Sequence, residues 1–449
     1  MSTSPQGSLD YSRTHPDYDR MLKRWIMAYD FFRGGAHVLQ PAQKVTDVSW
    51  CGGKRPTNPE QYGDSSTDSR YSDGADSQFE WYSTAVNSYL WKHEREKIVS
   101  YNRRQASAYH IPLFRPLCNV LASAVLKTGP DRQAAEALWS DYLGDVDLTG
   151  TPIGPFMRQA LTLGLVFGRV HAVTDMSRPG DLQPAASLAA QRASGIRAYS
   201  YLVMPFDLIN WALDDRGNFI WAIVRENAPD LRQPGQPSAG DADQYRVWSR
   251  TDWQLWRMVQ AGNAAPKWAM VDAGDNPLGR VPIQTLYCHR GSRTLFGCES
   301  PLADVVDIDR TILNKLSLLD ELISKGTFSI LAIPRRDGGA MGDLEVGPGS
   351  GLVFDAEAGV PLYISPDAAQ AAGLWAIIKA LFPSARISAE VGRGAAESSL
   401  EARSAAAIGA ESSDKHNVMA SLAEATEQFE RGLYRDVSDW EGQGQPPTV

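Results

Sequence analysis

The chain has 449 residues, of which 43% are hydrophobic and 22% are charged, and this length and composition predict two or three domains with well-buried cores. Its formal net charge of −9 argues against a protein that binds DNA tightly and statically, because neutralising phosphates requires a basic surface. The same charge is compatible with a surface that DNA passes without sticking. The chain has 4 cysteines and no CxxC pair, which indicates buried thiols in a reducing compartment.

The sequence contains no membrane signal. The opening MSTSPQGSLDYSRTHPDYDR is polar and lacks the apolar core of a signal peptide. The most apolar run, residues 160–173, is broken by glycines, an arginine and a histidine, and it is too short to span a bilayer. We therefore expect a soluble protein that is made inside the cell.

The first third of the chain has the periodicity of helices, separated by glycine and proline. Residues 51–78 are rich in Gly, Ser and Asp and predict a loop. A glycine-broken strand is expected in LVFGRVHAVTD, directly after the last of these helices. Helices are predicted at 16–34, within 79–127 with breaks at Ile111-Pro112 and before Gly129-Pro130, near 132–143, and near 153–166.

Between residues 199 and 290 the apolar period changes to two. Short aromatic and β-branched stretches such as FIWAIVREN and QYRVWSRTDWQLWRMV alternate with Asp/Gly/Asn turns. We expect a set of short strands here, with exposed linkers at 178–197 and 228–243.

A long helix follows, in GCESPLADVVDIDRTILNKLSLLDELISKGTFSILAIP. Ser300 suits the N-cap and Pro301 the first helical position, and a helix of about 26 residues would span roughly 40 Å. Its apolar side chains form a seam in which Asp309 is the one polar residue. The seam residues are Leu302, Val305, Ile312, Leu316, Leu319 and Ile323.

The rest of the chain predicts a return along this helix. A Gly-rich β segment at 328–365 precedes a second helix, which we expect Pro383 to end. Residues 384–397 have mixed character, and an Ala/Glu-rich helix with a soft point at Gly409 follows. Two helices that flank a small β insertion predict a protruding hairpin, and a seam packed against copies of the same hairpin in a ring would cover its apolar side chains.

The sequence has no catalytic or metal signature. CGGKRPT lacks the first glycine of a phosphate loop, and GPGSG is not surrounded by a strand and a helix. HEREK has Lys97 where a zincin needs its second histidine, and Cys288, His289 and Cys298 lack a fourth ligand. His110 and His171 fit packed environments better than catalysis. We predict no catalytic residues, no cofactor and no metal, and hence no enzyme.

Taken in order, these elements resemble the portal proteins of tailed bacteriophages over about residues 15–440. HPDYDRMLKRWIMAYDFFRGG resembles the opening helix of an uncharacterised portal-like phage family, and YNRRQASAYHIPLFRPLCNVLASAVL its next helices. YLVMPFDLINWALDDRGNFIWAIVRE resembles a strand pair of the portal wing. CESPLADVVDIDRTILNKLSLLDELISKGTFSILAIP resembles the first stem helix as it enters the clip. ESSLEARSAAA stands where portals often have Ser-Gly-x-Ala-Leu, with Ser399 in place of the glycine.

The resemblance implies an α+β, portal-like fold with an α/β wing, long stem helices, a small β-containing clip and a helical C-terminal region. The implied parts are the wing at 1–300, with a β-rich part at 199–290, the first stem helix at 301–327, the clip at 328–366, the second stem helix at 367–383, the tunnel loop at 384–397, and a C-terminal wing helix with a short crown at 398–449.

The implied function is a ring, usually of about twelve subunits, at one capsid vertex, through which double-stranded DNA is packaged and ejected. The implied partners are further copies of the chain, DNA, the major capsid protein, the large terminase subunit and a head-tail adaptor, and the need for a scaffold protein stays open. The implied location is the virion, after assembly in the host cytoplasm, with no membrane partner.

Within that frame the basic residues have expected roles. Arg386 and Arg393 of the tunnel loop, next to Gly392 and Gly394, are candidates for phosphate contact, as are Lys315 and Lys325 of the stem. The alternative is an exposed loop with two solvated arginines. Arg335 and Arg336 of the clip would face DNA or an acidic partner, or lie in a surface turn. The acids of the stem helix outnumber its bases and predict a net acidic wall.

Two other functions stay open. A different head-tail connector or minor capsid protein would share the setting, although such proteins are usually shorter and lack the stem-clip-stem order. A packaging-associated nuclease or NTPase would need a carboxylate cluster or a phosphate loop.

Overall fold

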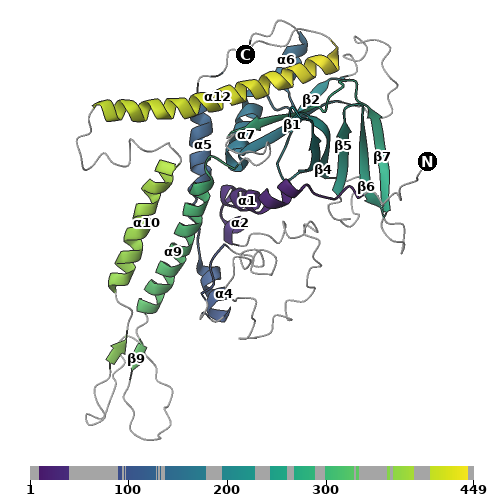
Figure 1. The fold of residues 1–449 in the computed structure, drawn as a ribbon. Coiled ribbons are helices and arrows are strands. Elements are labelled where there is room, and N and C mark those ends of the chain that lie inside the picture. Colours follow the sequence, from purple (N-terminus) through teal and green to yellow (C-terminus); the bar gives the residue numbers. More distant parts are fainter. Residues whose placement is uncertain are drawn as a thin grey trace, which may run out of the picture.

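The computed structural model describes residues 10–39, 89–93, 96, 98–127, 129, 132, 137–177, 195–227, 243–259, 267–288, 299–327, 330–332, 362–364, 368–388 and 405–442. The fold is of the mixed α+β class, as predicted, with long helices and antiparallel sheets. Helices and two sheets form a compact body, and two helices extend away from it (Figure 1).

The N-terminal helices have the boundaries that proline and glycine predicted. α1 begins at Pro16, where the side chain of His15 accepts the backbone N–H of Asp17 at 3.1 Å, and it ends before Gly34, whose φ of 68° suits glycine. The predicted break at Ile111-Pro112 is confirmed, because it falls between α4 and α5. The helices are α1 Pro16–Arg33, α2 Ala36–Leu39, α4 Ile98–Ser107, α5 Phe114–Val125, α6 Ala137–Gly144 and α7 Ile153–Phe167.

A three-stranded sheet, in the order β2-β1-β8, forms the centre of the body. Its strands are β1 Arg169–Met176, β2 Ala198–Val203 and β8 Ile283–Tyr287. β1 starts directly after Gly168, so the predicted strand is confirmed from Arg169 on. Residues 165–167, which were expected to begin the strand, instead form the end of α7. Gly168 has a φ of +85°, and a Cβ there would lie 2.4 Å from the carbonyl oxygen of Glu299, so this crossing requires glycine.

A five-stranded antiparallel sheet confirms the predicted run of short strands. Each strand pairs with the next in the chain, so the sheet is a meander in which Trp248 and Trp253 are fully buried. The strands are β3 Leu208–Leu213, β4 Phe219–Asn227, β5 Asp243–Ser249, β6 Asp252–Val259 and β7 Lys267–Asp275.

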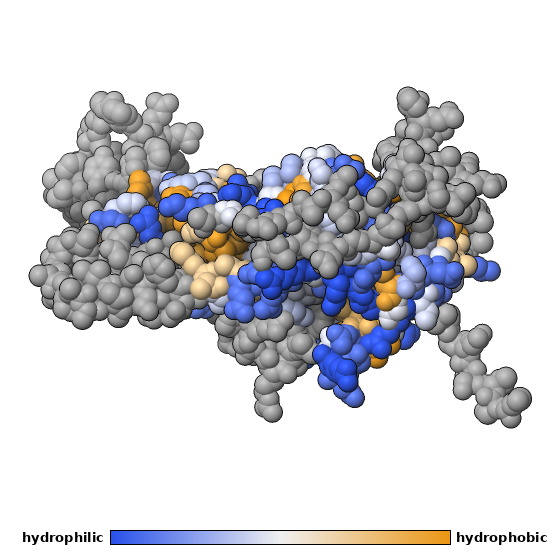
Figure 2. All heavy atoms as spheres, turned by 90° about the horizontal axis from the view of Figure 1, so that it is seen from above, coloured by the Kyte–Doolittle hydropathy of each residue, from blue (hydrophilic) through white to orange (hydrophobic). Residues whose placement is uncertain are grey.

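The C-terminal helix α12, Ala405–Glu441, closes the body. It runs through Gly409 without a break, so the soft point predicted there is wrong: one glycine costs only about 1 kcal/mol in a helix this long. Asp436 accepts hydrogen bonds from Arg280 at 2.6 Å and from Gln284 at 2.6 Å, which fixes α12 on the three-stranded sheet. Seen from the side of α12, the described surface is mainly hydrophilic, with hydrophobic residues in small groups (Figure 2).

One core joins all of these elements. Side chains of α1, α5, α7, both sheets, α12 and the following helix α9 (Ala303–Thr327) belong to a single buried cluster. The predicted wing and C-terminal helix are therefore one body. None of the helices that the structure describes has both the length and the apolar composition for crossing a bilayer.

We expect the stability penalty that comes from the buried Asp30 in α1 to shrink as the pH falls from 8 to 5. Burial raises the pKa of Asp30 from 3.8 to about 6, although the hydroxyl of Tyr89 donates a hydrogen bond to it at 2.6 Å. The folded state therefore binds more protons than the unfolded state in this range, and the penalty is absent below the unfolded pKa near 4. Asp30→Asn should raise the free energy of unfolding at pH 8 by about 2–3 kcal/mol and leave it unchanged near pH 3.5, as measured by urea unfolding.

The matched control is Asp215→Asn in the exposed β3–β4 turn, which should change stability by less than about 0.5 kcal/mol at either pH. An equal effect of Asp30→Asn at both pH values would contradict this account of Asp30.

Candidate functional site: the α9–α10 hairpin

Two helices and two short strands form a hairpin that leaves the body. α9 runs outward, strands β9 (Ile330–Ala332) and β10 (Leu362–Ile364) pair antiparallel, and α10 (Ala368–Ser388) returns beside α9. Figure 1 shows the strands at the end of the hairpin that lies farthest from the sheets. The predicted succession of helix, short strands and returning helix is present.

The start of α9 lies two residues later than predicted. The hydroxyl of Ser300 donates to the carbonyl of Leu165 in α7 and accepts the N–H of Leu302 at 3.0 Å. The N–H of Ala303 then reaches the carbonyl of Ser300 at 3.1 Å, which makes a turn of residues 300–303. Ser300 caps this turn, and α9 begins at Ala303 because the same hydroxyl ties the segment to α7.

The apolar seam of α9 packs on its own chain, so its interpretation as a contact between copies is wrong for most of its length. Leu302 and Val305 belong to the core of the body, and Ile312 and Leu316 pack around Ile378 of α10. The outermost seam residue, Ile323, has 53% of its surface exposed. The seam residues at the start of α9 therefore pack in the body, and those toward its end lie on the part of the helix that extends away from the body.

Asp309, the one polar residue of the seam, joins α9 to the body. Its carboxylate is fully buried and accepts the backbone N–H groups of Leu113 and Phe114, each at 3.0 Å, at the start of α5. It also lies 2.9 Å from Nε2 of His110, whose side chain is fully buried. A carboxylate at a helix N-terminus is stabilised by the orphan N–H groups and the helix dipole, so Asp309 caps a helix that is distant in sequence.

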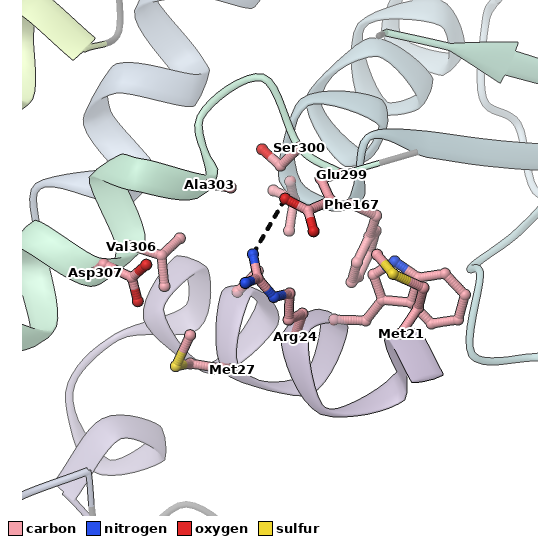
Figure 3. Close-up of a pocket in the computed structure, with 12 residues that line it drawn as sticks. Met21, Arg24, Met27, Phe167, Glu299, Ser300, Ala303, Val306 and Asp307 are labelled. Carbon is pink, nitrogen blue, oxygen red and sulfur yellow. Dashed lines mark hydrogen bonds and ion pairs between the residues drawn. The ribbon is translucent and has the colours of Figure 1, made fainter. Parts of the chain in front are cut away.

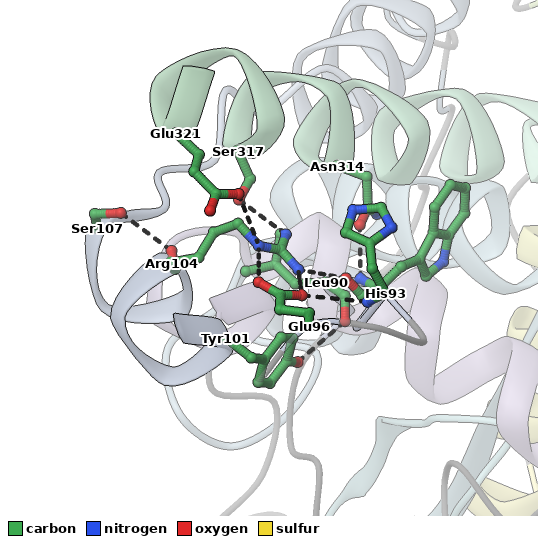
Figure 4. A network of polar contacts seen from close by, with 10 residues as sticks. Leu90, His93, Glu96, Tyr101, Arg104, Ser107, Asn314, Ser317 and Glu321 are labelled. Atoms are coloured by element: carbon green, nitrogen blue, oxygen red, sulfur yellow. Dashed lines mark hydrogen bonds and ion pairs between the residues drawn. The ribbon is translucent and has the colours of Figure 1, made fainter. Parts of the chain in front are cut away.

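A second polar network joins α9 to α4 (Figure 4). Arg104 of α4 pairs with Glu96 at 2.8 Å and donates to the hydroxyl of Ser317 on α9 at 3.2 Å. Nearby, Asn314 of α9 donates to the carbonyl of Tyr89 at 3.1 Å. Burial acts to raise the pKa of Glu96, but the hydrogen bond and charge of Arg104 outweigh it and hold that pKa below its usual value.

These contacts correct the predicted acidic wall of the stem. Asp309 is buried at the contact between α9 and α5, and Glu321 lies 3.9 Å from Arg104. Asp304 and Asp307 are exposed, and Asp320 is half-buried. The acidic surface of α9 is therefore smaller than predicted, because Asp309 and Glu321 face α5 and Arg104, and it consists of Asp304, Asp307 and the half-buried Asp320.

Within the described part of the hairpin, α10 has an exposed apolar face. Trp375 and Ile377 are 45% and 49% exposed, and Ala372, Ala376 and Ala380 are exposed with them. The only charged residues of α10 are Lys379 and Arg386. A face with large apolar side chains and few charges is typical of a contact surface.

The end of α10 corrects the predicted stem boundary. The helix continues through Pro383 to Ser388, so residues 384–388 are helical and the tunnel loop cannot begin at 384. A proline removes one backbone hydrogen bond, and here the turn after it is retained because Ala385 is buried in the core of the body. Arg386 therefore lies on the last turn of a helix, exposed to solvent.

The remaining predicted contact residues are only partly visible. Lys315 is half-buried on α9, and Lys325 lies near the end of α9, where side chains are outside the described set. Arg335, Arg336 and Arg393 lie outside the described residues. Sequence reasoning missed the structural role of Asp309, although a lone acid in an apolar seam was a signal, and it missed Arg104.

A small cavity lies where α1, α7 and α9 meet (Figure 3). It has a volume of about 30 Å³, which is room for a water molecule, and Arg24 pairs with Glu299 beside it at 3.1 Å. Among the described residues, no three His, Cys, Asp or Glu side chains are grouped to hold a metal ion.

Comparison with known proteins leaves the site to be interpreted on its geometry. The chain matches no protein-family model and no curated protein sequence.

We expect Asp309→Asn to lower the free energy of unfolding by about 2–4 kcal/mol. The side-chain NH₂ of the asparagine would lie in a buried site next to the backbone N–H groups of α5, which are themselves donors, so one hydrogen bond is lost and polar groups stay unpaired. Urea unfolding followed by circular dichroism measures this change. Asp307→Asn, on the exposed face of the same helix, is the matched control and should change stability by less than about 0.5 kcal/mol. Equal stability of the two variants would show that Asp309 does not hold the joint.

Proposed function

We propose that the chain is a portal protein: copies of it form a ring at one capsid vertex, and the ring encloses a channel through which double-stranded DNA is packaged and ejected. The observation that carries this proposal is the α9–α10 hairpin, which is fixed rigidly to the body at one end and presents an apolar face on α10. One side of the hairpin is covered by the body, and the apolar side chains on its other side are exposed and would be covered by a second copy of the chain. A cyclic ring provides such a contact for every copy.

The hairpin's charge suits a channel for DNA. Exposed acids on the first turns of α9 keep phosphates from binding there, and few basic side chains are repeated around the ring. Lys315 is a candidate for transient phosphate contact. Lys325, Arg335, Arg336 and Arg393 keep the roles that the resemblance to portal proteins implies.

The resemblance also supplies the proposed partners. The ring would be bound by the major capsid protein, and it would dock the large terminase subunit during packaging and a head-tail adaptor afterwards. The protein would then be a component of the virion, usually in about twelve copies. Its role would be structural, without catalysis of its own.

The tip of the hairpin supports assembly through strands. β9 and β10 are three residues each, and a two-stranded sheet of that size is marginally stable in water. Strands from neighbouring tips would complete a larger sheet by edge pairing and so tie the copies together.

Negative-stain images of the purified protein test the proposal. We expect closed rings with a central hole, together with no cleavage of double-stranded DNA in the presence of Mg²⁺ or Mn²⁺. A monomer with metal-dependent nuclease activity would reject the portal proposal in favour of a packaging enzyme.

Deletion of residues 335–352 tests the tip as an assembly element. We expect monomers or irregular rings in native mass spectrometry, because the short strands of the tip need strands from a neighbouring copy and the deletion shortens the tip between them. Replacement of the same residues by a Gly/Ser linker of equal length is the matched variant and should behave in the same way. Closed rings of normal size would show that the tip does not tie the copies together.

A further inference from the structure

The open faces of α9 and α10 are complementary in charge where they approach the body. The open face of α9 contains Thr311, Lys315 and Leu318, and Asp307 lies exposed at its upper end, on the edge next to the cavity between α9 and α1. The upper end of α10 contains Arg386, also exposed. Neither side chain has an ion-pair partner within the part of the chain that the structure describes, and Arg24, which lines the same cavity as Asp307, is paired with Glu299.

The packing of the hairpin places Arg386 and Asp307 at the same position along its long axis, which we call their height. Ile378 of α10 packs between Ile312 and Leu316 of α9, which sets the register of the two antiparallel helices. Arg386 follows Ile378 by eight residues, and Asp307 precedes Ile312 by five residues and Leu316 by nine. At about 1.5 Å per residue, the two side chains lie within about one helical turn of each other along the hairpin.

The two side chains also lie on matching flanks. With 3.6 residues per turn, Arg386 and Trp375 lie on one flank of the open face of α10, and Ile377 lies on the other. On α9, Asp307 lies on one flank and Lys315 on the other. When these two faces are turned toward each other with the helices antiparallel, Arg386 and Asp307 share a flank, and Lys315 falls beside Ile377.

We propose that Arg386 of one copy pairs with Asp307 of the next copy, within a contact between the open face of α10 and the open face of α9. This inference rests on the proposed ring, because rotation about an axis parallel to the hairpin leaves the height of every residue unchanged. The contact is head-to-tail, so it closes a ring instead of making a two-fold dimer. It covers Trp375 and Ile377, and it assigns Arg386 and Lys315 to the subunit contact instead of to DNA. Asp307 would likewise lie in this contact, and Asp304 would be the acid of the first turns of α9 that stays on the channel surface.

Charge reversal tests this pairing by its effect on assembly. Arg386→Glu and Asp307→Lys should each raise the protein concentration at half-assembly by about three- to tenfold at low ionic strength. The double variant should restore the wild-type value, and high salt should reduce all of these differences. Arg216→Glu, an exposed arginine in the β3–β4 turn, is the matched control and should assemble like the wild type.

A cross-linking experiment gives a second readout that does not depend on the amount of ring. The Arg386→Lys variant is prepared once with ¹⁴N and once with ¹⁵N, the two preparations are mixed and assembled, and a carbodiimide is added to couple the new amine to nearby carboxylates. A cross-linked peptide that joins residue 386 of one isotope to Asp307 of the other is expected, because it can form only between two copies. Rings that form normally in both single variants, with no such mixed peptide, overturn the pairing and leave the portal proposal standing. A wild-type protein that forms no ring at any concentration overturns both.

Discussion

The buried carboxylate of Asp309 is the constraint on which the rest of the structure depends. It closes the first turn of α5 from a helix nearly two hundred positions later in the sequence, and it holds His110 in the same pocket. A buried charge persists only where donors surround it, so α9 cannot rotate or slide without breaking several charge-assisted hydrogen bonds at once. The direction in which the hairpin leaves the body is therefore set by a polar joint and not by apolar packing alone.

Because the hairpin is fixed in this way, α9 and α10 each have one surface that is covered by the rest of the chain and one that is exposed. Toward the body, α9 is held by the Arg104 network and by side chains of the core. On the other side, Trp375 and Ile377 remain exposed on a helix with only two charged residues. A single chain has no described segment that covers this face, and a rigid joint prevents the hairpin from folding back to cover it. We propose that association of copies covers this face, and in that proposal the hairpin is the part of the molecule that connects fold to function.

Much of this fold follows from local patterns in the sequence. The five-stranded meander and the glycine before β1 were predictable because period-two alternation and turn residues are local signals. The end of α10 was not, because burial of Ala385 retains a turn that Pro383 alone would end. The seam of α9 was recognised, but its partner was assigned to another copy, since periodicity identifies an apolar face without identifying what covers it. The role of Asp309 could not be predicted, because it depends on a contact with α5, which is almost two hundred residues away in the sequence.

The most direct test is a cryo-electron microscopy reconstruction of the purified full-length protein. The account predicts a closed, rotationally symmetric particle whose bore admits a DNA double helix, with each α10 seated against the α9 of the adjacent copy. Particles of one isolated chain, or a ring in which the hairpins point away from the axis and touch no neighbour, would contradict it.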